Sequence, residues 1–383
     1  MVTRTKTQAQ GDRARTAAIA VVVCIAFTAL AGPGTAHASG KGFVGAVDPF
    51  PTRCSPSLFK HGNCLATKDL QRMERSHIKT ARWGFRWSEV EKNKGVYDWR
   101  LTDATIGALA NRGIGVLPVV AGSPAWAAPT YGTAPTKTKP ARRGWRKFLK
   151  AAVERYGPGG RYWTSPTLYR RSFPNAPIKP IRAWQIWNEP NIKGGAQYVK
   201  PAKYRNLVRA AHHAILKIDP KARIVLGGMP GYVRSHAWVY LKKLYKHKRF
   251  RHKFDAVALH PYAPDVGHVL IQIDRMRQVM KRHHDGHASL WITELGWGSK
   301  SPSKNQPINQ GPEGQARLLR QSFPLLKRYR HRWRIRHAYW YRWRDPPPGT
   351  PGCTFCGSSG LFHNNQDPKP AWRAFKQAVR SHR

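Results

Sequence analysis

The sequence is short of acidic residues. Its 383 residues include 19 Asp and Glu against 67 Lys and Arg, which gives a formal net charge of +48. The basic residues are spread over the whole chain, and a field of this size attracts polyanions and speeds their capture. Uronic-acid polysaccharides, phosphate-bearing wall polymers and nucleic acids are therefore candidate partners. The alternative is a basic surface that adheres to an anionic cell envelope without a dedicated ligand.

The sequence also lacks an apolar stretch long enough to span a membrane comfortably. Its main apolar run, residues 17–31, follows a basic segment and precedes an A-x-A cleavage pattern at Ala36-His37-Ala38. This order of segments is that of a secretory signal peptide. We therefore expect residues 1–38 to be removed and the mature protein to be secreted, without a transmembrane span.

Cysteines are few. One of the five, Cys24, lies in the expected signal peptide, where we interpret it as apolar filler. The other four make an even count, which predicts disulfides in an exported protein. Short loops favour the pairs Cys54–Cys64 and Cys353–Cys356, although four cysteines allow three pairings. A zinc site built from the two pairs is the alternative.

Residues 39–383 contain no low-complexity linker, no glycine-rich phosphate loop and no metal-ligand spacing. We therefore expect a single domain over these residues, with no cofactor and no metal. Apolar strand patterns alternate with amphipathic helix patterns through this part of the chain. The expected strands are 43–47, 80–85, 114–120, 181–187, 223–227, 254–259, 290–293 and 337–343. The expected helices are 68–78, 98–112, 143–156, 201–218, 237–248, 269–282, 314–328 and 369–379.

Eight strand–helix pairs in one run favour an α/β fold of the (β/α)8 TIM-barrel type over an open doubly wound sheet. Residues 158–180, rich in Pro, Gly, Ser and Tyr, do not fit the alternation. They are expected to form an insertion loop before the fourth strand.

Two glutamates stand at the ends of expected strands. Glu189 follows the strand 181–187 directly after Asn188, and Glu294 follows the strand 290–293. Active sites of such barrels lie at the carboxyl ends of the strands, where both glutamates fall. Glycoside hydrolysis needs two such acids, one to protonate the leaving oxygen and one to attack the anomeric carbon or to guide water to it. Taken singly, each glutamate could instead cap a loop.

The residues around these glutamates resemble those of a known superfamily. Trp187-Asn188-Glu189-Pro190-Asn191 and Thr293-Glu294-Leu295-Gly296-Trp297 resemble the motifs of the retaining (β/α)8 glycoside hydrolases of clan A. The chain is similar to the family 39 and family 5 types, which include β-xylosidases and endo-glycanases. The resemblance covers nearly all of residues 39–383, and smaller motifs that agree with it are Arg82, 87–91, 95–99, 122–126, 260–262 and 360–362.

This resemblance implies roles for the catalytic residues. Glu189 matches the acid/base and Glu294 the nucleophile, with their carboxyl groups about 5–5.5 Å apart. Asn188 matches the residue that binds the sugar 2-hydroxyl. Arg82 and Tyr262 match the groups that keep the nucleophile ionised and oriented.

Further substrate-binding residues follow from the same resemblance. His260 matches a polar neighbour in the same site. Trp343 or Trp340 matches the tryptophan under the sugar, and strand alternation allows only one of the two to point inward. Trp126 and Trp297 are the remaining aromatic candidates, with packing in the core or at the rim as the alternative for both.

The loop 345–360 departs from the superfamily pattern, because it carries three consecutive prolines and the Cys353/Cys356 pair. We expect it to shape one end of a substrate cleft. The sequence thus predicts a secreted retaining glycoside hydrolase that cleaves β-O-glycosidic bonds of a polysaccharide or oligosaccharide, which could be acidic. The alternative is a non-catalytic glycan- or envelope-binding protein on a barrel scaffold. A dedicated nucleic-acid site is disfavoured, because the aromatic residues cluster with the acids.

Overall fold

The computed structural model describes residues 42–47, 67–232 and 236–381. The expected signal peptide and the expected Cys54–Cys64 pair lie outside these residues. Within them, no helix is long and apolar enough to cross a membrane.

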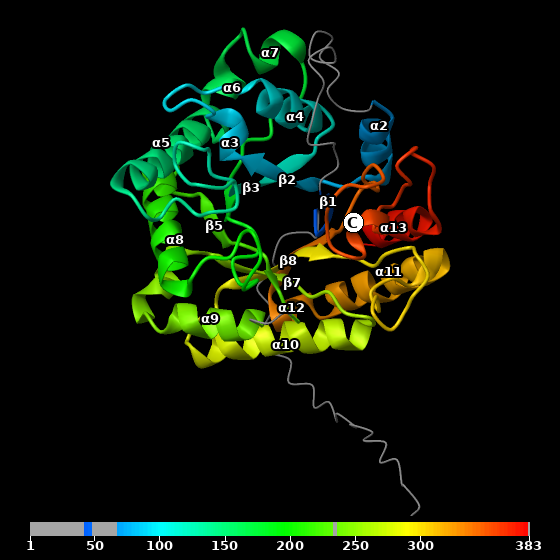
Figure 1. Cartoon of the computed structure of the whole chain (residues 1–383). Coiled ribbons are helices and arrows are strands. Elements are labelled where there is room, and N and C mark those ends of the chain that lie inside the picture. The colour runs from blue at the N-terminus through cyan, green and yellow to red at the C-terminus, as the bar shows by residue number, and fades with distance from the viewer. Residues whose placement is uncertain (1–41, 48–66, 233–235, 382–383) are drawn as a thin grey trace, which may run out of the picture. The chain divides into compact units, whose positions relative to one another are not determined.

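The strands form one parallel sheet that closes on itself (Figure 1). In the sheet order, β5-β4-β3-β2-β1-β9-β8-β7-β6, the additional pairing of β5 with β7 completes the barrel. β6 continues β5 after Gly227 and Gly228, so the two strands share one of eight barrel positions. The strands are β1 (Val44–Val47), β2 (Thr80–Arg86), β3 (Gly115–Ala121), β4 (Ala183–Ile186), β5 (Arg223–Leu226), β6 (Met229–Pro230), β7 (Ala256–His260), β8 (Ser289–Leu295) and β9 (Ile335–Trp340).

Helices surround the strands, and the predicted (β/α)8 fold is confirmed. The longer helices are α2 (Thr67–Ser76), α4 (Arg100–Asn111), α5 (Lys139–Tyr156), α8 (Pro201–Leu216), α9 (Ala237–Tyr245), α10 (Val266–Arg282), α11 (Gly311–Arg328) and α13 (Pro370–Arg380). The short ones are α3 (Trp87–Val90), α6 (Arg161–Thr164), α7 (Tyr169–Ser172) and α12 (Arg330–Trp333).

Side-chain caps explain where two helices begin earlier than predicted. α5 begins after Thr138, whose hydroxyl accepts a hydrogen bond from the Ala141 amide at 3.2 Å. α10 begins after Asp265, whose carboxylate accepts from the His268 amide at 2.9 Å. Both caps satisfy amide groups that the first turn of a helix leaves without a partner.

Two other predictions were wrong in detail. The segment 158–180 is not a plain loop, because it contains α6 and α7, anchored where the Tyr162 hydroxyl donates to the Asp103 carbonyl at 2.6 Å. The last strand ends at Trp340 instead of residue 343. Beyond it, the carbonyls of Arg342 and Trp343 accept from the Leu361 amide, so this stretch also bonds to the C-terminal segment. Its contact with the sheet is reduced to single hydrogen bonds, such as that from the Trp343 amide to the Val47 carbonyl at 3.1 Å.

The hydrophobic core has two parts. Polar groups occupy the carboxyl end of the barrel. Large aromatic residues fill the space between strands and helices, and Phe148 of α5 stacks against Trp87 and Trp99 there. A smaller cluster that includes Leu117, Trp291 and Tyr339 fills the barrel interior.

We expect Phe148→Ala to destabilise the fold by about 3–5 kcal/mol, because it leaves a cavity among fully buried rings. Urea denaturation followed by circular dichroism measures the change. Val96→Ala is the control, since Val96 is 64% exposed and its truncation removes little packing. Equal midpoints for the two variants would contradict the prediction.

Candidate active site

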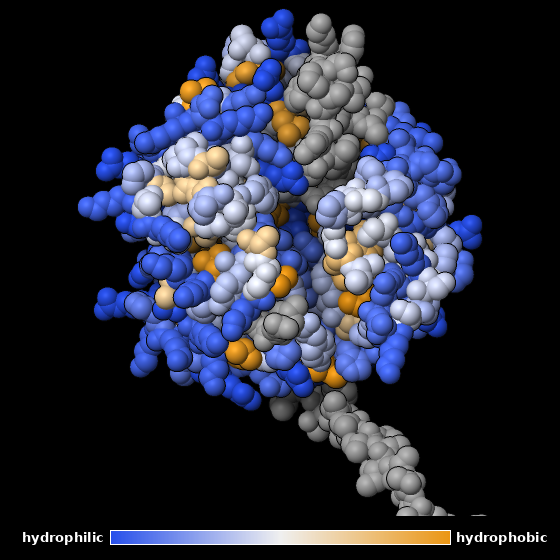
Figure 2. Space-filling model, in the orientation of Figure 1, coloured by the Kyte–Doolittle hydropathy of each residue, from blue (hydrophilic) through white to orange (hydrophobic). Residues whose placement is uncertain are grey.

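Four strands bring buried polar side chains to the carboxyl end of the barrel. They are Arg82 of β2, Gln185 of β4, His260 of β7 and Glu294 of β8. Figure 2 shows a hollow in the middle of the ring of helices, with hydrophilic residues beneath it. Figure 1 gives the same view of the elements.

Glu294 is held by donors on both oxygens. Arg82 Nη1 donates to its Oε1 at 2.6 Å, and the Tyr262 hydroxyl donates to its Oε2 at 2.6 Å. The pairing of β8 with β9 shifts register between Ile292 and Leu295, so β8 contains one extra residue there. Neighbouring residues of a strand normally point to opposite faces, and Thr293 faces the barrel interior, where its hydroxyl accepts from Gln185. The bulge changes the direction of the next side chain, so Glu294 faces the interior as well.

The environment of Glu294 favours its ionised form. Burial by itself raises the pKa of this carboxyl, but the charges of His260 and Arg82 and the hydrogen bonds from Tyr262 and Arg82 outweigh it. The resulting pKa lies below its ordinary value. Burial and the neighbouring Glu294 carboxylate raise the pKa of Tyr262 far above its ordinary value, so its hydroxyl remains a donor.

Glu189 is placed differently. It follows β4 in a left-handed backbone conformation (φ 45°), as does Trp187 (φ 71°), which few non-glycine residues adopt. Its amide donates to the Gly228 carbonyl at 3.0 Å, and its side chain is 26% exposed, against 9% for Glu294. Glu189, at the end of β4, is therefore partly open to solvent, whereas Glu294 of β8 is buried.

His260 lies between the two carboxylates. Its Nδ1 is 3.0 Å from Glu189 Oε1 and 3.5 Å from Glu294 Oε2. The ring fits because residue 228 is glycine: a Cβ there would lie 1.9 Å from His260 Nε2. The interruption of the barrel strand between β5 and β6 therefore makes room for this histidine.

The two glutamates and His260 each offer an atom within 4.8 Å of the others. Among the described residues, this is the group that could hold a metal ion. Both Glu294 oxygens already accept strong hydrogen bonds, however, and one donor is the Arg82 cation. The chemistry of this set fits a carboxylate pair held by hydrogen bonds better than a metal centre.

Asn188 and Gln185 complete the arginine network. Arg82 Nη2 donates to Asn188 Oδ1 at 2.7 Å, and Arg82 Nε donates to Gln185 Oε1 at 2.7 Å. Sequence reasoning missed Gln185. Its signal was a lone amide inside an otherwise apolar buried strand, since a fully buried polar side chain needs partners.

The structure does not bring three of the expected tryptophans to this site, which corrects their assignment as substrate contacts. Trp340 points out of the barrel toward Phe323 of α11, and Trp297 packs beside it. Trp343 donates to Asp69 of α2 at 3.1 Å. All three are fully buried, because the helices α2, α11 and α13 cover the outer face of the sheet.

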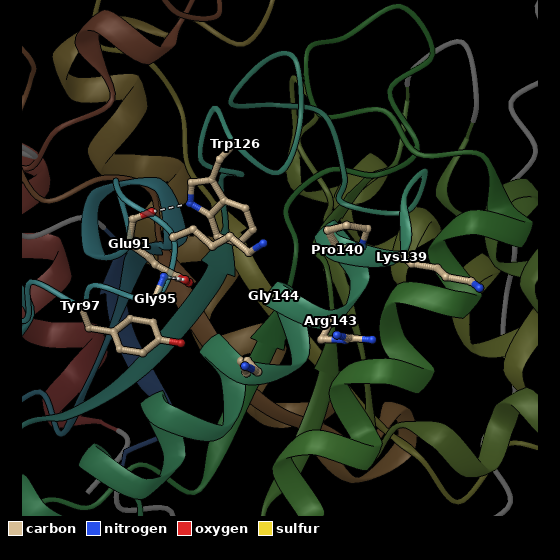
Figure 3. Close-up of a pocket in the computed structure, with 10 residues that line it drawn as sticks. Glu91, Gly95, Tyr97, Trp126, Lys139, Pro140, Arg143 and Gly144 are labelled. Atoms are coloured by element: carbon tan, nitrogen blue, oxygen red, sulfur yellow. Dashed lines mark hydrogen bonds between the residues drawn. The ribbon is translucent and has the colours of Figure 1, made fainter.

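Trp126 lies elsewhere again. Its Nε1 donates to the Glu91 carbonyl at 3.0 Å, and its ring lines a separate cavity with Tyr97 (Figure 3). Neither Glu189 nor Glu294 lines that cavity.

The loop 345–360 contributes a contact that was not predicted from the sequence. Phe355 packs on the Tyr262 ring at 4.8 Å between centroids, and Tyr341 packs on the same ring at 5.9 Å. The sulfur atoms of Cys353 and Cys356, which flank Phe355, lie at bonding distance. This loop therefore contacts the tyrosine that orients Glu294.

Comparisons with known proteins agree with this geometry. Residues 59–219, which include Glu189, match the glycoside hydrolase family 42 model, described as β-galactosidase. The match lies in the part of the chain that forms the first half of the barrel. No curated protein matches the chain.

Solved structures of glycoside hydrolases resemble the barrel in fold. A family 39 glycoside hydrolase from Bacteroides cellulosilyticus has a TM-score of 0.61 and 18% identity over 88% of this chain. A β-xylosidase from Caulobacter crescentus has the same three values. A family 5 enzyme from Streptomyces cattleya, in complex with Manβ1-4GlcNAc, has a TM-score of 0.59 and 15% identity over 89% of this chain. The chain spans 63%, 68% and 80% of these proteins, respectively.

We expect Tyr262→Phe to raise the pKa of Glu294, because the ionised carboxylate loses a hydrogen bond. Carbon-13 NMR titration of the glutamate carboxyls measures this pKa, and Glu294→Gln identifies the signal. The exposed Tyr232, changed to Phe, is the control. An unchanged Glu294 titration in Tyr262→Phe would show that the phenol does not support its charge.

Proposed function

We propose that the protein is a secreted retaining glycoside hydrolase that cleaves β-O-glycosidic bonds by double displacement. The observation that carries this proposal is the carboxylate pair with atoms within 4.8 Å of each other. Retaining enzymes hold their carboxyl groups about 5–5.5 Å apart, whereas inverting enzymes leave about 6.5–9.5 Å for a water. The short separation supports direct attack by one carboxylate.

The two environments support different roles for the two acids. Glu294, ionised and oriented by Arg82 and Tyr262, attacks the anomeric carbon and forms a glycosyl ester. Glu189, which is more exposed and contacts His260, donates its proton to the leaving oxygen. It then takes a proton from the water that cleaves the ester, and the sugar leaves with its original configuration.

Asn188 is proposed to bind the sugar 2-hydroxyl. Its Oδ1 accepts from Arg82 at 2.7 Å, and its amide nitrogen donates to Gln197 at 3.3 Å, which fixes the orientation of the amide. A hydrogen bond at the 2-hydroxyl strengthens in the transition state of this reaction.

The β-linkage and the secretion are parts of the same proposal. The similar structures include a β-xylosidase and an enzyme in complex with a β1-4 disaccharide, which supports a β-linked oligosaccharide or polysaccharide as substrate. The leader pattern in residues 1–38 supports secretion. The net charge of +48 supports electrostatic association with an anionic cell envelope.

We expect Glu294→Ala to lower kcat/KM on a 4-nitrophenyl β-glycoside roughly 10⁴-fold or more, because the nucleophile is lost. Proton NMR of the parent reaction is expected to detect the β-anomer as the first product. Glu313→Ala, an exposed acid on α11, is the matched control. Parent-like turnover in Glu294→Ala would refute the mechanism. Glycan binding without hydrolysis, unaffected by the same change, would favour the non-catalytic alternative.

The loss of cleavage rate in Glu189→Ala should depend on the leaving group of the substrate. With an unactivated β-glycoside, the loss of the general acid is expected to slow cleavage by about 10²–10⁴-fold. With a 2,4-dinitrophenyl leaving group, which needs no proton, attack by Glu294 continues and the glycosyl-enzyme accumulates for lack of a base. Intact-protein mass spectrometry detects the added sugar. Equal losses on both substrates, with no adduct, would remove Glu189 from the acid/base role.

A further inference from the structure

A cavity of about 380 Å³ lies apart from the carboxylate pair, since neither Glu189 nor Glu294 lines it. It is lined by the segment after β2, the loop after β3 and the first turns of α5 (Figure 3). In Figure 3, Trp126 lies on one side of it, and Lys139 and Arg143 of α5 lie on the other. Since the segments after β2 and β3 follow the carboxyl ends of these strands, the cavity belongs to the same end of the barrel as Glu189 and Glu294.

One face of α5 presents a row of cations to this cavity. Lys139, Arg143 and Lys147 stand four residues apart, so they lie above one another on the helix, and all three are exposed. In the described part of the chain, none of them forms an ion pair within 4.0 Å. Like charges at this spacing repel, and a cation at a helix N-terminus, as at Lys139, is unfavourable. Local stability therefore does not explain the row, whereas an anion lying along it would relieve the repulsion.

The acid in the cavity wall does not neutralise these cations. Glu91 is buried, and its carboxylate accepts from Trp87 Nε1 at 2.6 Å and from the Gly95 amide at 2.7 Å. Both of its carboxylate oxygens are therefore bonded to neighbouring residues and not to the cations of α5. A fourth cation, Lys94, lies with its Nζ 5.9 Å from the centre of the Trp126 ring and also lines the cavity.

The remaining walls suit a sugar. Trp126 offers an indole, and α5 approaches that ring closely because residue 144 is glycine: a Cβ there would lie 2.4 Å from Trp126 Cη2. Burial, together with Glu91 and Glu154, raises the pKa of Tyr97 to about 12, so its hydroxyl remains a donor. An apolar ring face with nearby hydroxyl donors and cations matches a sugar unit that carries a carboxylate.

Packed rings connect this cavity to the catalytic strand. Trp126 contacts Trp87 at 5.3 Å, Trp87 contacts Trp145 at 5.6 Å, and Trp145 contacts Trp187 at 6.5 Å between centroids. Trp187 is separated from Glu189 by a single residue. The cavity is therefore rigidly placed relative to the acid, as a subsite remote from the cleaved bond would be.

We propose that this cavity is a subsite for a uronic-acid unit of the glycan substrate, with its carboxylate held by the cations of α5. The proposal rests on the proposed glycosidase function. Lys139 and Lys147 are separated by about 12 Å along the helix axis. A row of that length fits a polymer that carries several carboxylates better than a single compact anion.

The test measures binding separately from hydrolysis. In a Glu294→Gln background, isothermal titration calorimetry at about 0.15 M salt, where distant surface charges are screened, compares two ligands. One is a glucuronic-acid-containing β-linked oligosaccharide, and the other is the same oligosaccharide after its carboxyl groups have been reduced to hydroxymethyl groups. We expect the acidic ligand to bind about tenfold more tightly. Replacement of Lys139, Arg143 and Lys147 by Gln should abolish this preference.

The matched control replaces Lys217, Lys221 and Arg223 by Gln. These residues carry the same three charges, are exposed and lie at the opposite end of the barrel, at the end of α8 and the start of β5. This control is expected to keep the preference.

A preference that survives in the α5 variant, is lost equally in the control, or is absent from the parent protein would overturn the proposal. Arg143→Gln alone, with a partial loss expected, replaces the triple variant if circular dichroism shows that variant to be unfolded. Because binding does not require turnover, these outcomes are independent of whether Glu294 catalyses hydrolysis.

Discussion

The ion pair between Arg82 and Glu294 is the interaction on which the arrangement of the site depends. Both side chains are buried, and removing two charges from water costs several kcal/mol per ion unless their partners are well placed. Arg82 uses its donors on Glu294, Asn188 and Gln185, so one guanidinium ties β2, β4 and β8 together. Tyr262 occupies the other Glu294 oxygen. Loss of either partner would leave a buried charge without compensation.

This pair also separates the properties of two chemically identical side chains. Glu294 has an arginine, a phenol and a histidine around it, whereas the described contact of the Glu189 carboxylate is His260 alone, and its side chain is partly open to solvent. Pairs of acids whose environments differ in this way are typical of sites in which one acid stays ionised and the other exchanges a proton. The difference arises from the fold, since each acid stands at the end of a different strand.

Much of the barrel could be predicted because its strands and helices alternate in clear apolar patterns. The same patterns placed Glu189 and Glu294 at strand ends. They could not reveal the bulge in β8, because a register shift depends on pairing with β9. The resemblance to the superfamily misplaced Trp340 and Trp343, since an aromatic residue near a strand end looks the same in the sequence whether it faces a substrate or a covering helix. Gln185 was missed because a single amide does not disturb an apolar periodicity.

The backbone at Glu189 has a consequence of its own. The left-handed conformations of Trp187 and Glu189 lie in a region where side chains other than glycine and asparagine are disfavoured, at a cost of order 1–3 kcal/mol each. The carboxylate is therefore held at a position that folding alone would give to a smaller residue. Selection for stability and selection for chemistry oppose each other there, so the strand end that carries the proposed acid is also a place where the domain gives up some of its stability.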